Sequence, residues 1–457
     1  LAICLACYRF RPTLYVPALL IVSVAFYYWS AGKDTLILLG IIGLNWAGAL
    51  AMARWSSARI ATLLILANLA VLGLFKYAGF FSSNIDTLAG TNLNQVLGGI
   101  VLPAGVSFFI FQAISYVIDV RRGDIRPELN LVTYGAYQSL FPHLIAGPIV
   151  RYRDIIADVR NAQVNADNFA VGITRFAHGL FKKVVIADGV GPIADAVFAL
   201  PPGELDFLTA WLGALAYAIQ IYFDFSGYSD MAIGLACMLG IRFPENFDRP
   251  YVSRSITEFW RRWHISLSSW FRDYVYIPLG GNRRGAAKTY RNLLIVFAAT
   301  GLWHGAAWTF IVWGLLHGAF LIGERALFRS PSQSLNHPAL RWCYCLPVVI
   351  FAWVIFRSSS IEQALSLWRA MLSPANLVSL DEVAGRAAFG SYTLAAFAVG
   401  ALMFVIPGRT SMGSRLMHEP ANLPLQIANL GYTAVALTGA AALTLTSGYS
   451  PFLYFTF

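Results

Sequence analysis

Long apolar segments alternate with short basic segments along the whole chain. Many of the apolar segments are about twenty residues long, which is the length a helix needs to cross about 30 Å of hydrocarbon. A membrane barrel would instead show shorter segments whose side chains alternate with a period of two. The pattern therefore predicts an all-α integral membrane protein.

Basic residues between the apolar segments predict the orientation, because cytoplasmic loops are enriched in Lys and Arg. Arg9 and Arg11 precede the first segment and place the N-terminus in the cytoplasm. An odd number of crossings then places the C-terminus outside. The pattern predicts eleven crossings: residues 12–31, 35–53, 60–81, 97–120, one within 169–200, 207–240, two short ones within 292–324, 342–356, 391–407 and 425–445.

The sequence has no repeat with a period of 20 to 50 residues and no inverted pair of broken helices. We therefore expect a single membrane-embedded domain over residues 1–457, with a motif-rich core at about residues 105–318. The chain begins with Leu1 rather than Met and shows no cleavable signal. The true N-terminus is therefore expected to be missing, which leaves the number of crossings open.

Two segments do not fit simple crossings. Residues 131–150 are apolar but have basic residues on both sides, and Pro142, Gly147 and Pro148 would interrupt a helix. Because broken backbone is tolerated at membrane depth only where protein or a cavity covers it, we expect this segment to enter the membrane and return. Residues 242–292 interleave Arg and Lys with Trp and Tyr, which is typical of an interfacial amphipathic element.

Composition agrees with a membrane protein. Hydrophobic residues make up 58% of the 457 residues and charged residues only 12%, whereas a soluble domain carries about a quarter charged residues. The net charge of +10 lies in patches between apolar segments, which indicates cytoplasmic loops rather than a nucleic-acid surface. The cysteines lack zinc-binding or disulfide spacing and are interpreted as packing residues: Cys4, Cys7, Cys237, Cys343 and Cys345.

Ionisable residues within or beside apolar segments mark candidate sites, because a polar group in the membrane is costly without a partner or a function. Asp224 and Asp230, within IYFDFSGYSD, either orient a histidine, line a tunnel or pair with an arginine. The other candidates are Arg261, Arg262 and His264 within EFWRRWHISLSSWFRD, and His304 and His317 within TGLWHGAAWTFIVWGLLHG.

His304 is the main candidate for chemistry. A helix that begins near Asn292 would place it about 18 Å into the membrane, where burial favours the neutral imidazole that can accept a proton. Gly301 and Gly305 would let another helix or a substrate approach the backbone closely, and Trp303 either lines that path or packs in the core. A structural hydrogen bond, a catalytic base and a metal ligand all stay open for such a histidine.

Several alternatives are less favoured. On a continuous helix His317 would not share a face with His304, so His317 is interpreted as structural, as are His143 and His178. The sequence contains neither H-E-x-x-H nor G-x-S-x-G, and no phosphate-binding glycine pattern after a strand. We therefore expect no metal site and no bound cofactor. The basic GGNRRG segment at 280–285 either binds a phosphate or forms a cytoplasmic turn.

Several motifs, taken in order, closely resemble the membrane-bound O-acyltransferases. The similar bacterial members acetylate alginate, peptidoglycan or cellulose, or transfer D-alanine to teichoic acid. The resemblance covers about residues 105–318 and the last residues of the chain. The motifs are FPHLIAGPIVRY, YFDFSGYSDMAIGLACMLGIRFPENFDRPY, SITEFWRRWHISLSSWFRDYVYIPLGGNRRG, GLWHGAAWTFIVWGLLHG and the terminal FLYFTF.

The resemblance implies a ring of helices around a central funnel in a bacterial inner membrane. It also implies that His304 is catalytic and that His264 is a second functional histidine. His304 would act as a base on an acceptor hydroxyl, and His264 or a nearby donor would stabilise the oxyanion. Further candidates are Trp263, Trp303, Asp224, Asp230 and Ser268 along the tunnel, and Arg261, Arg262, Arg283 and Arg284 on the cytoplasmic face for the donor.

We expect acetyl-CoA, or a smaller acyl carrier, as the cytoplasmic donor. The acceptor would be an extracytoplasmic polysaccharide or a periplasmic partner acetyltransferase, with membrane lipid around the protein and no nucleic acid. D-alanyl transfer from a carrier protein is the alternative within the same class. An exporter or channel would predict flux without acyl turnover, and a scaffold for a polysaccharide synthase would predict partner binding that survives loss of both histidines.

Overall fold

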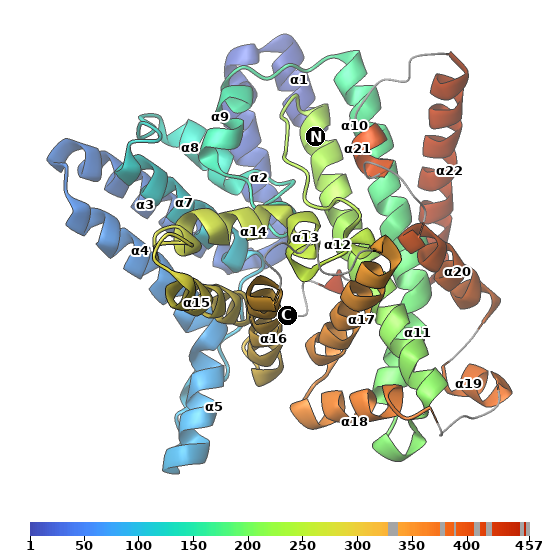
Figure 1. Cartoon of the computed structure of the whole chain (residues 1–457). Coiled ribbons are helices and arrows are strands. Elements are labelled where there is room, and N and C mark those ends of the chain that lie inside the picture. The colour runs from blue at the N-terminus through green and yellow to red at the C-terminus, as the bar shows by residue number, and fades with distance from the viewer. Residues whose placement is uncertain are drawn as a thin grey trace. The chain divides into compact units, whose positions relative to one another are not determined.

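The computed structural model describes residues 1–327, 337–374, 380–387, 390–405, 412–416, 423–447 and 452–453. Within these ranges every regular element is a helix (Figure 1). This confirms the all-α prediction. The C-terminal ends of two expected features, residues 406–407 of the tenth crossing and residues 454–457 of the terminal motif, lie outside the described residues.

The α-helices of the first half are α1 (Ala2–Phe10), α2 (Tyr15–Ala31), α3 (Thr35–Trp55), α4 (Ala58–Leu72), α5 (Ala78–Ala89), α6 (Asn94–Leu97), α7 (Val106–Arg122), α8 (Leu131–Ser139), α9 (Tyr152–Arg160), α10 (Ala166–Phe181), α11 (Asp188–Ala199) and α12 (Phe207–Met238). Those of the second half are α13 (Ile256–Arg262), α14 (Ile265–Phe271), α15 (Ala286–His304), α16 (Trp308–Leu327), α17 (Pro338–Arg357), α18 (Ile361–Met371), α19 (Leu380–Arg386), α20 (Ser391–Val405), α21 (Met412–Leu416) and α22 (Leu423–Ser447).

Short helical segments of other types join these helices. The 3₁₀ turns are η1 (Pro12–Leu14), η2 (Gly32–Asp34), η5 (Pro202–Glu204) and η6 (Pro250–Val252). The π-helical turns are η3 (Gly73–Tyr77), η4 (Lys182–Ala187) and η7 (Arg272–Tyr276).

Six helical stretches within the described residues are long and apolar enough to cross a membrane, and the shorter Ser391–Leu402 is also apolar. Large apolar side chains on these stretches are exposed, for example Leu36, Leu63 and Leu66. Such exposure fits lipid contact better than water contact. The six stretches are Pro12–Trp55, Ala58–Ala89, Phe207–Met238, Trp308–Leu327, Pro338–Arg357 and Gln426–Thr446.

The first stretch, Pro12–Trp55, is 44 residues long and contains both of the first two predicted crossings. It is divided at η2, where Gly32 has a φ of 56°, a conformation that glycine adopts without steric cost. The fourth predicted crossing is wrong at its start, because helix α7 begins at Val106 rather than at Leu97. Pro103 and Gly105 (φ 73°) interrupt any helix before that residue.

The packing divides the chain into two compact units. The first unit comprises residues Leu1–Phe176 and Ala232–Pro244, and the second comprises Ala177–Met231 and Glu245–Phe457. In the first unit, helices α3, α4 and α7 lie side by side (Figure 1). Asn45 of α3 and Asn68 of α4 are fully buried and exchange side-chain hydrogen bonds of 3.2 and 2.8 Å.

The segment expected to enter the membrane and return is broken as predicted. Helix α8 has nine residues, and Asn130 caps it by accepting hydrogen bonds from the backbone of Val132 and Thr133. The irregular, mostly buried stretch 140–150 follows it. Gln138 donates a hydrogen bond of 2.6 Å to the carbonyl of Phe109 on α7, so another part of the protein satisfies this polar side chain of the segment.

In the second unit, α15 and α16 form the two-helix hairpin expected for residues 292–324, and they lie side by side (Figure 1). A Cβ atom added at Gly301 would collide with the carbonyl of Phe310, and one added at Gly314 with the carbonyl of Phe297. The two backbones therefore touch at these glycines. This confirms that Gly301 allows another helix to approach closely.

Helices α13 and α14 and the turn η7 lie outside the six membrane-crossing stretches. They form the element that the sequence predicts to be interfacial. Helix α16 fixes its beginning, because the Glu324 carboxylate accepts hydrogen bonds from the backbone of Ile256 and Thr257 and, at 2.7 Å, from the Thr257 hydroxyl. A carboxylate at a helix N-terminus satisfies amide groups that have no partner within the helix.

Candidate active site

His304 is the last residue of α15, directly before the tight turn to α16. Three aromatic rings surround its imidazole: Trp303 at 4.9 Å, Trp313 at 5.0 Å and Phe356 at 5.3 Å between ring centroids. The side chain is 5% exposed. Because α15 begins at Ala286, the expected helix start near Asn292 is wrong. Measured along the helix axis, His304 lies about 27 Å from the start of α15, rather than about 18 Å as expected.

His317 lies on α16 and is brought towards His304 by the turn. Both imidazoles contact Trp313, each with a centroid distance of 5.0 Å, so the hairpin places the two histidines around one ring although they would not share a face of a continuous helix. The indole of Trp260 donates a hydrogen bond of 3.3 Å to Nδ1 of His317. This contact is of the structural kind that the sequence predicts for His317.

His264 separates α13 from α14 and adopts a left-handed backbone conformation with φ 44°. Its side chain is 0% exposed. Burial lowers its pKa to about 3, because removal from water disfavours the charged ring. The imidazole is therefore neutral at physiological pH.

Asn246 contacts the imidazole of His264 directly. It is not among the candidate residues that the sequence indicates. Oδ1 of Asn246 lies 3.1 Å from Nδ1 of His264 and accepts hydrogen bonds from the backbone and hydroxyl of Ser266 at 3.2 and 2.8 Å. Asn246 also donates a hydrogen bond of 3.1 Å to Oγ of Ser229. The signal available in the sequence is the polar Asn within FPENFDRPY.

Three of the predicted site residues, Asp224, Trp263 and His304, line a narrow cavity. His264 does not line this cavity, but its ring lies 4.7 Å from that of Phe225, which does, and 5.9 Å from that of Trp303, the neighbour of His304. The two functional histidines expected from the sequence are thus close to the same cavity. Its full lining is Ile221, Asp224, Phe225, Trp263, His304, Trp353, Phe356 and Leu453.

Each of the two buried carboxylates of α12 forms an ion pair with a lysine of the π-turn η4. Nζ of Lys183 lies 2.9 Å from Asp224, and Nζ of Lys182 lies 2.8 Å from Asp230. Asp224 also accepts a hydrogen bond of 3.1 Å from the backbone of Leu453. Charge beside His304 is therefore balanced within the protein.

Asp230 has a second basic neighbour. Nε2 of His178 lies 3.7 Å from its carboxylate, and Nδ1 of His178 lies 2.6 Å from the hydroxyl of Tyr432. Asp230 does not line the narrow cavity. The geometry separates the two aspartates, since Asp224 borders the cavity and Asp230 belongs to this neighbouring polar cluster.

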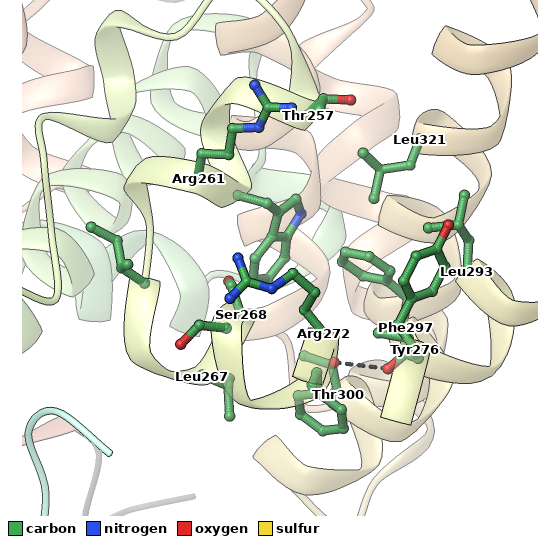
Figure 2. A pocket seen from close by; sticks show the side chains of 15 residues that line it. Thr257, Arg261, Leu267, Ser268, Arg272, Tyr276, Leu293, Phe297, Thr300 and Leu321 are labelled. Carbon is green, nitrogen blue, oxygen red and sulfur yellow. Dashed lines mark hydrogen bonds between the residues drawn. The ribbon is translucent and has the colours of Figure 1, made fainter. Parts of the chain in front are cut away.

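A larger pocket of about 430 Å³ opens between α13–α14–η7 and the α15–α16 hairpin (Figure 2). Figure 2 shows Arg261, Ser268 and Arg272 on one side of it and Leu293, Phe297 and Leu321 on the other. The pocket thus combines the guanidinium of Arg261, the guanidinium of Arg272, which pairs with Asp273 at 2.7 Å, and hydroxyl groups with an apolar wall. Such a lining suits a ligand that carries both phosphate and apolar parts.

Among the predicted donor-binding arginines, only Arg261 lines this pocket, and Arg272 is not one of those that the sequence indicates. Arg262 forms ion pairs with Asp248 at 3.2 Å and with Glu258 at 3.0 Å. Arg283 and Arg284 are exposed in the turn before α15 and do not line the pocket. The hydroxyl of Ser268 donates to the carbonyl of Trp263 at 3.4 Å, and Ser268 lines the larger pocket rather than the narrow cavity.

Comparison with known proteins identifies the family. Residues 50–368 match the sequence profile of the membrane-bound O-acyltransferase family. The probable alginate O-acetylase of Azotobacter vinelandii is 44% identical over 445 residues, which is 91% of this chain and 88% of that protein. The peptidoglycan O-acetyltransferase of Helicobacter pylori is 37% identical over 388 residues, covering 78% of this chain and 73% of that protein.

The name of a more distant relative specifies a different acyl group. The teichoic acid D-alanyltransferase of Bacillus subtilis is 30% identical over 266 residues, which is 55% of this chain and 66% of that protein. The helical architecture, the apolar stretches and the matches to these enzymes agree with one another. The chain therefore belongs to the membrane-bound O-acyltransferase family and is a multi-pass membrane O-acyltransferase.

Proposed function

We propose that the protein transfers an acetyl group from a cytoplasmic thioester, acetyl-CoA or a smaller acyl carrier, to a hydroxyl group on the other side of the membrane. The acceptor is a hydroxyl of an extracytoplasmic polysaccharide or of a periplasmic partner transferase. The single observation that carries this proposal is that His304 lines the narrow cavity, because acyl transfer to a hydroxyl requires a base close to the reacting atoms.

An acetyl group fits the relatives better than D-alanine does. The probable alginate O-acetylases of Azotobacter vinelandii and Pseudomonas putida align with more than nine tenths of this chain at 44% and 42% identity. The D-alanyltransferase of Bacillus subtilis aligns with 55% of it at 30% identity. We therefore propose acetyl as the acyl group and an alginate-like or peptidoglycan-like polymer as the final acceptor.

In the proposed reaction, His304 takes the proton of the acceptor hydroxyl as its oxygen attacks the thioester carbonyl. The new C–O bond forms, the C–S bond breaks, and the sulfur leaves with the proton that His304 returns. The products are an O-acetyl ester and a free thiol, so the donor and the acceptor balance the reaction without an oxidant or any further reactant. Trp303, Trp313 and Phe356 keep water from the imidazole, which limits hydrolysis of the thioester.

We propose that the larger pocket receives the donor. Arg261 and Arg272 would bind phosphate groups of CoA or of a phosphopantetheine arm, because guanidinium groups form strong charge-assisted hydrogen bonds to phosphate. The apolar wall of Phe297 and Leu321 would contact the less polar part of the arm. In this arrangement the cytoplasmic side of the protein is the side on which the pocket opens.

The direct test uses purified protein with acetyl-CoA labelled on the acetyl group and an unacetylated mannuronate oligosaccharide. We expect CoA release and labelled ester with the wild type, and loss of both by at least about 100-fold in His304→Gln. His317→Gln is the matched control, since glutamine can still accept the hydrogen bond from Trp260. Equal transfer by wild type and His304→Gln would contradict the proposal.

A further inference from the structure

The orientation of the Asn246 amide is determined by its neighbours. Asn246 is 0% exposed, and the backbone N–H of Ser266 lies 3.2 Å from one of its terminal atoms. A backbone N–H can only donate, so that atom must be the carbonyl oxygen Oδ1 and not the amide nitrogen. The amide nitrogen then faces Oγ of Ser229, at 3.1 Å, which can accept from it.

This orientation determines which nitrogen of His264 carries the hydrogen. Nδ1 of His264 lies 3.1 Å from the same Oδ1 atom, and two lone pairs at that distance would repel each other. Nδ1 is therefore the donor. A neutral imidazole has one N–H, so Nε2 carries the lone pair. Within the described part of the chain, Nε2 of His264 is buried and has no hydrogen-bond partner.

The backbone supports the same arrangement. The N–H of Ile265 donates a hydrogen bond of 2.9 Å to the carbonyl of Asn246, and the N–H of Asp248 donates one of 2.9 Å to the carbonyl of Arg262. These bonds connect the chain near Asn246 to the chain just before and just after His264. His264 itself has φ 44°, which is unfavourable for a residue other than glycine and persists where the surroundings fix it.

We propose that Asn246 is a positioning residue that holds His264 in its Nδ1–H form and thereby presents Nε2 to the reaction as a hydrogen-bond acceptor. This proposal rests on the proposed acyl transfer at the cavity beside His264. It assigns His264 a role opposite to oxyanion stabilisation, which needs a hydrogen-bond donor. His264 instead accepts a hydrogen bond from the incoming substrate, and the oxyanion donor is another group.

The first test needs no catalytic turnover. Protein with ¹⁵N-labelled histidine is studied by NMR, and the His264 signals are assigned by their loss in His264→Gln. We expect a protonated Nδ1 and an unprotonated Nε2 in the wild type, and a shift towards protonated Nε2 in Asn246→Leu. A protonated Nε2 in the wild type, or an unchanged ring in Asn246→Leu, overturns the proposal.

The second test uses Asn246→Asp, because a carboxylate can only accept and so keeps Nδ1–H. Asn246→Asp should retain acetyl transfer within about tenfold, whereas Asn246→Leu should lose about 100-fold in kcat. The added negative charge raises the affinity of His264 for a proton, so the acidic limb of the kcat/KM profile should move to higher pH in Asn246→Asp. Loss of transfer in a folded Asn246→Asp protein, or an unmoved acidic limb, overturns the proposal.

Asn45→Leu is the matched control. It removes an equally buried asparagine amide in the first unit and should change neither the ring of His264 nor the pH profile. The two proposals fail in different ways. If the wild type shows the Nδ1–H ring but no variant or wild type transfers acetyl groups, the proposed function fails while the positioning by Asn246 stands.

Discussion

At the scale of single residues, each of the two buried aspartates of α12 lies beside a lysine that balances its charge. Lys183 lies between Asp188 and Asp224, at 2.6 and 2.9 Å, and Lys182 lies 2.8 Å from Asp230. The π-turn η4 that contains the two lysines widens the helix at this point. One consequence is that Asp224 borders the narrow cavity without leaving an uncompensated charge next to His304.

Lys183→Met tests this balance. Removing the ammonium leaves the buried carboxylate of Asp224 without its ion-pair partner, which is expected to cost about 3–5 kcal/mol of stability. Thermal unfolding in detergent would show a lower Tm. The double variant Lys183→Met/Asp224→Asn removes both charges and should recover most of the loss. A single variant as stable as the wild type would contradict the structural role of the pair.

At the scale of elements, the α15–α16 hairpin carries His304 and forms one wall of the larger pocket. Its two helices approach closely at Gly301 and Gly314, where each glycine faces a carbonyl of the other helix. The last turn of α16 contains Glu324, which accepts hydrogen bonds from the backbone at the start of α13. A change in the helix spacing would therefore move His304 and the α13–α14 element together.

Gly314→Ala is expected to disturb this hairpin. The added methyl group would collide with the backbone of Phe297, and overpacking of this kind typically costs about 1–3 kcal/mol. Gly323→Ala is the matched control on the same helix, because no atom lies within 4 Å of the added group. That variant should be neutral or slightly more stable. Equal thermal unfolding of the two variants would show that the close approach is not important.

The pocket between the hairpin and α13–α14–η7 gives a prediction about donor affinity. Arg261→Ala and Arg272→Ala should each raise KM for acetyl-CoA by about tenfold or more with little change in kcat, because each loses a charge-assisted hydrogen bond to phosphate. Arg283→Ala and Arg284→Ala change residues in the exposed turn and should leave KM nearly unchanged. The reverse ranking of the variants would place the donor at the turn and not in the pocket.

At the scale of the whole molecule, the apolar pattern predicts the long helices best. Predicted crossings 35–53 and 342–356 fall within α3 and α17, because their apolar residues are continuous and flanked by charge. The start of α15 was not predicted, since AAKTYRN is polar yet helical. The hydrophobic pattern of the sequence does not distinguish the π-helical turns from α-helix.

The site was predictable only in part. His304 and His264 could be identified because a titratable ring in an apolar segment is unusual, and the geometry places both beside one cavity. The contact of Asn246 with His264 joins residues on an irregular segment, where no hydrophobic period indicates which side chains meet. Likewise, the lysine partners of Asp224 and Asp230 come from another helix, and the sequence pattern does not specify that packing.

The central claim is that acyl transfer takes place at His304 and carries the acetyl group across the membrane. Proteoliposomes that enclose a polysaccharide acceptor test it most directly when acetyl-CoA, labelled on the acetyl group, is added only outside. The account predicts labelled ester in the lumen and unlabelled CoA outside, both dependent on His304 and absent in His304→Gln. Labelled ester that forms equally in the His304→Gln vesicles, or that forms only when donor and acceptor share one side, would contradict it.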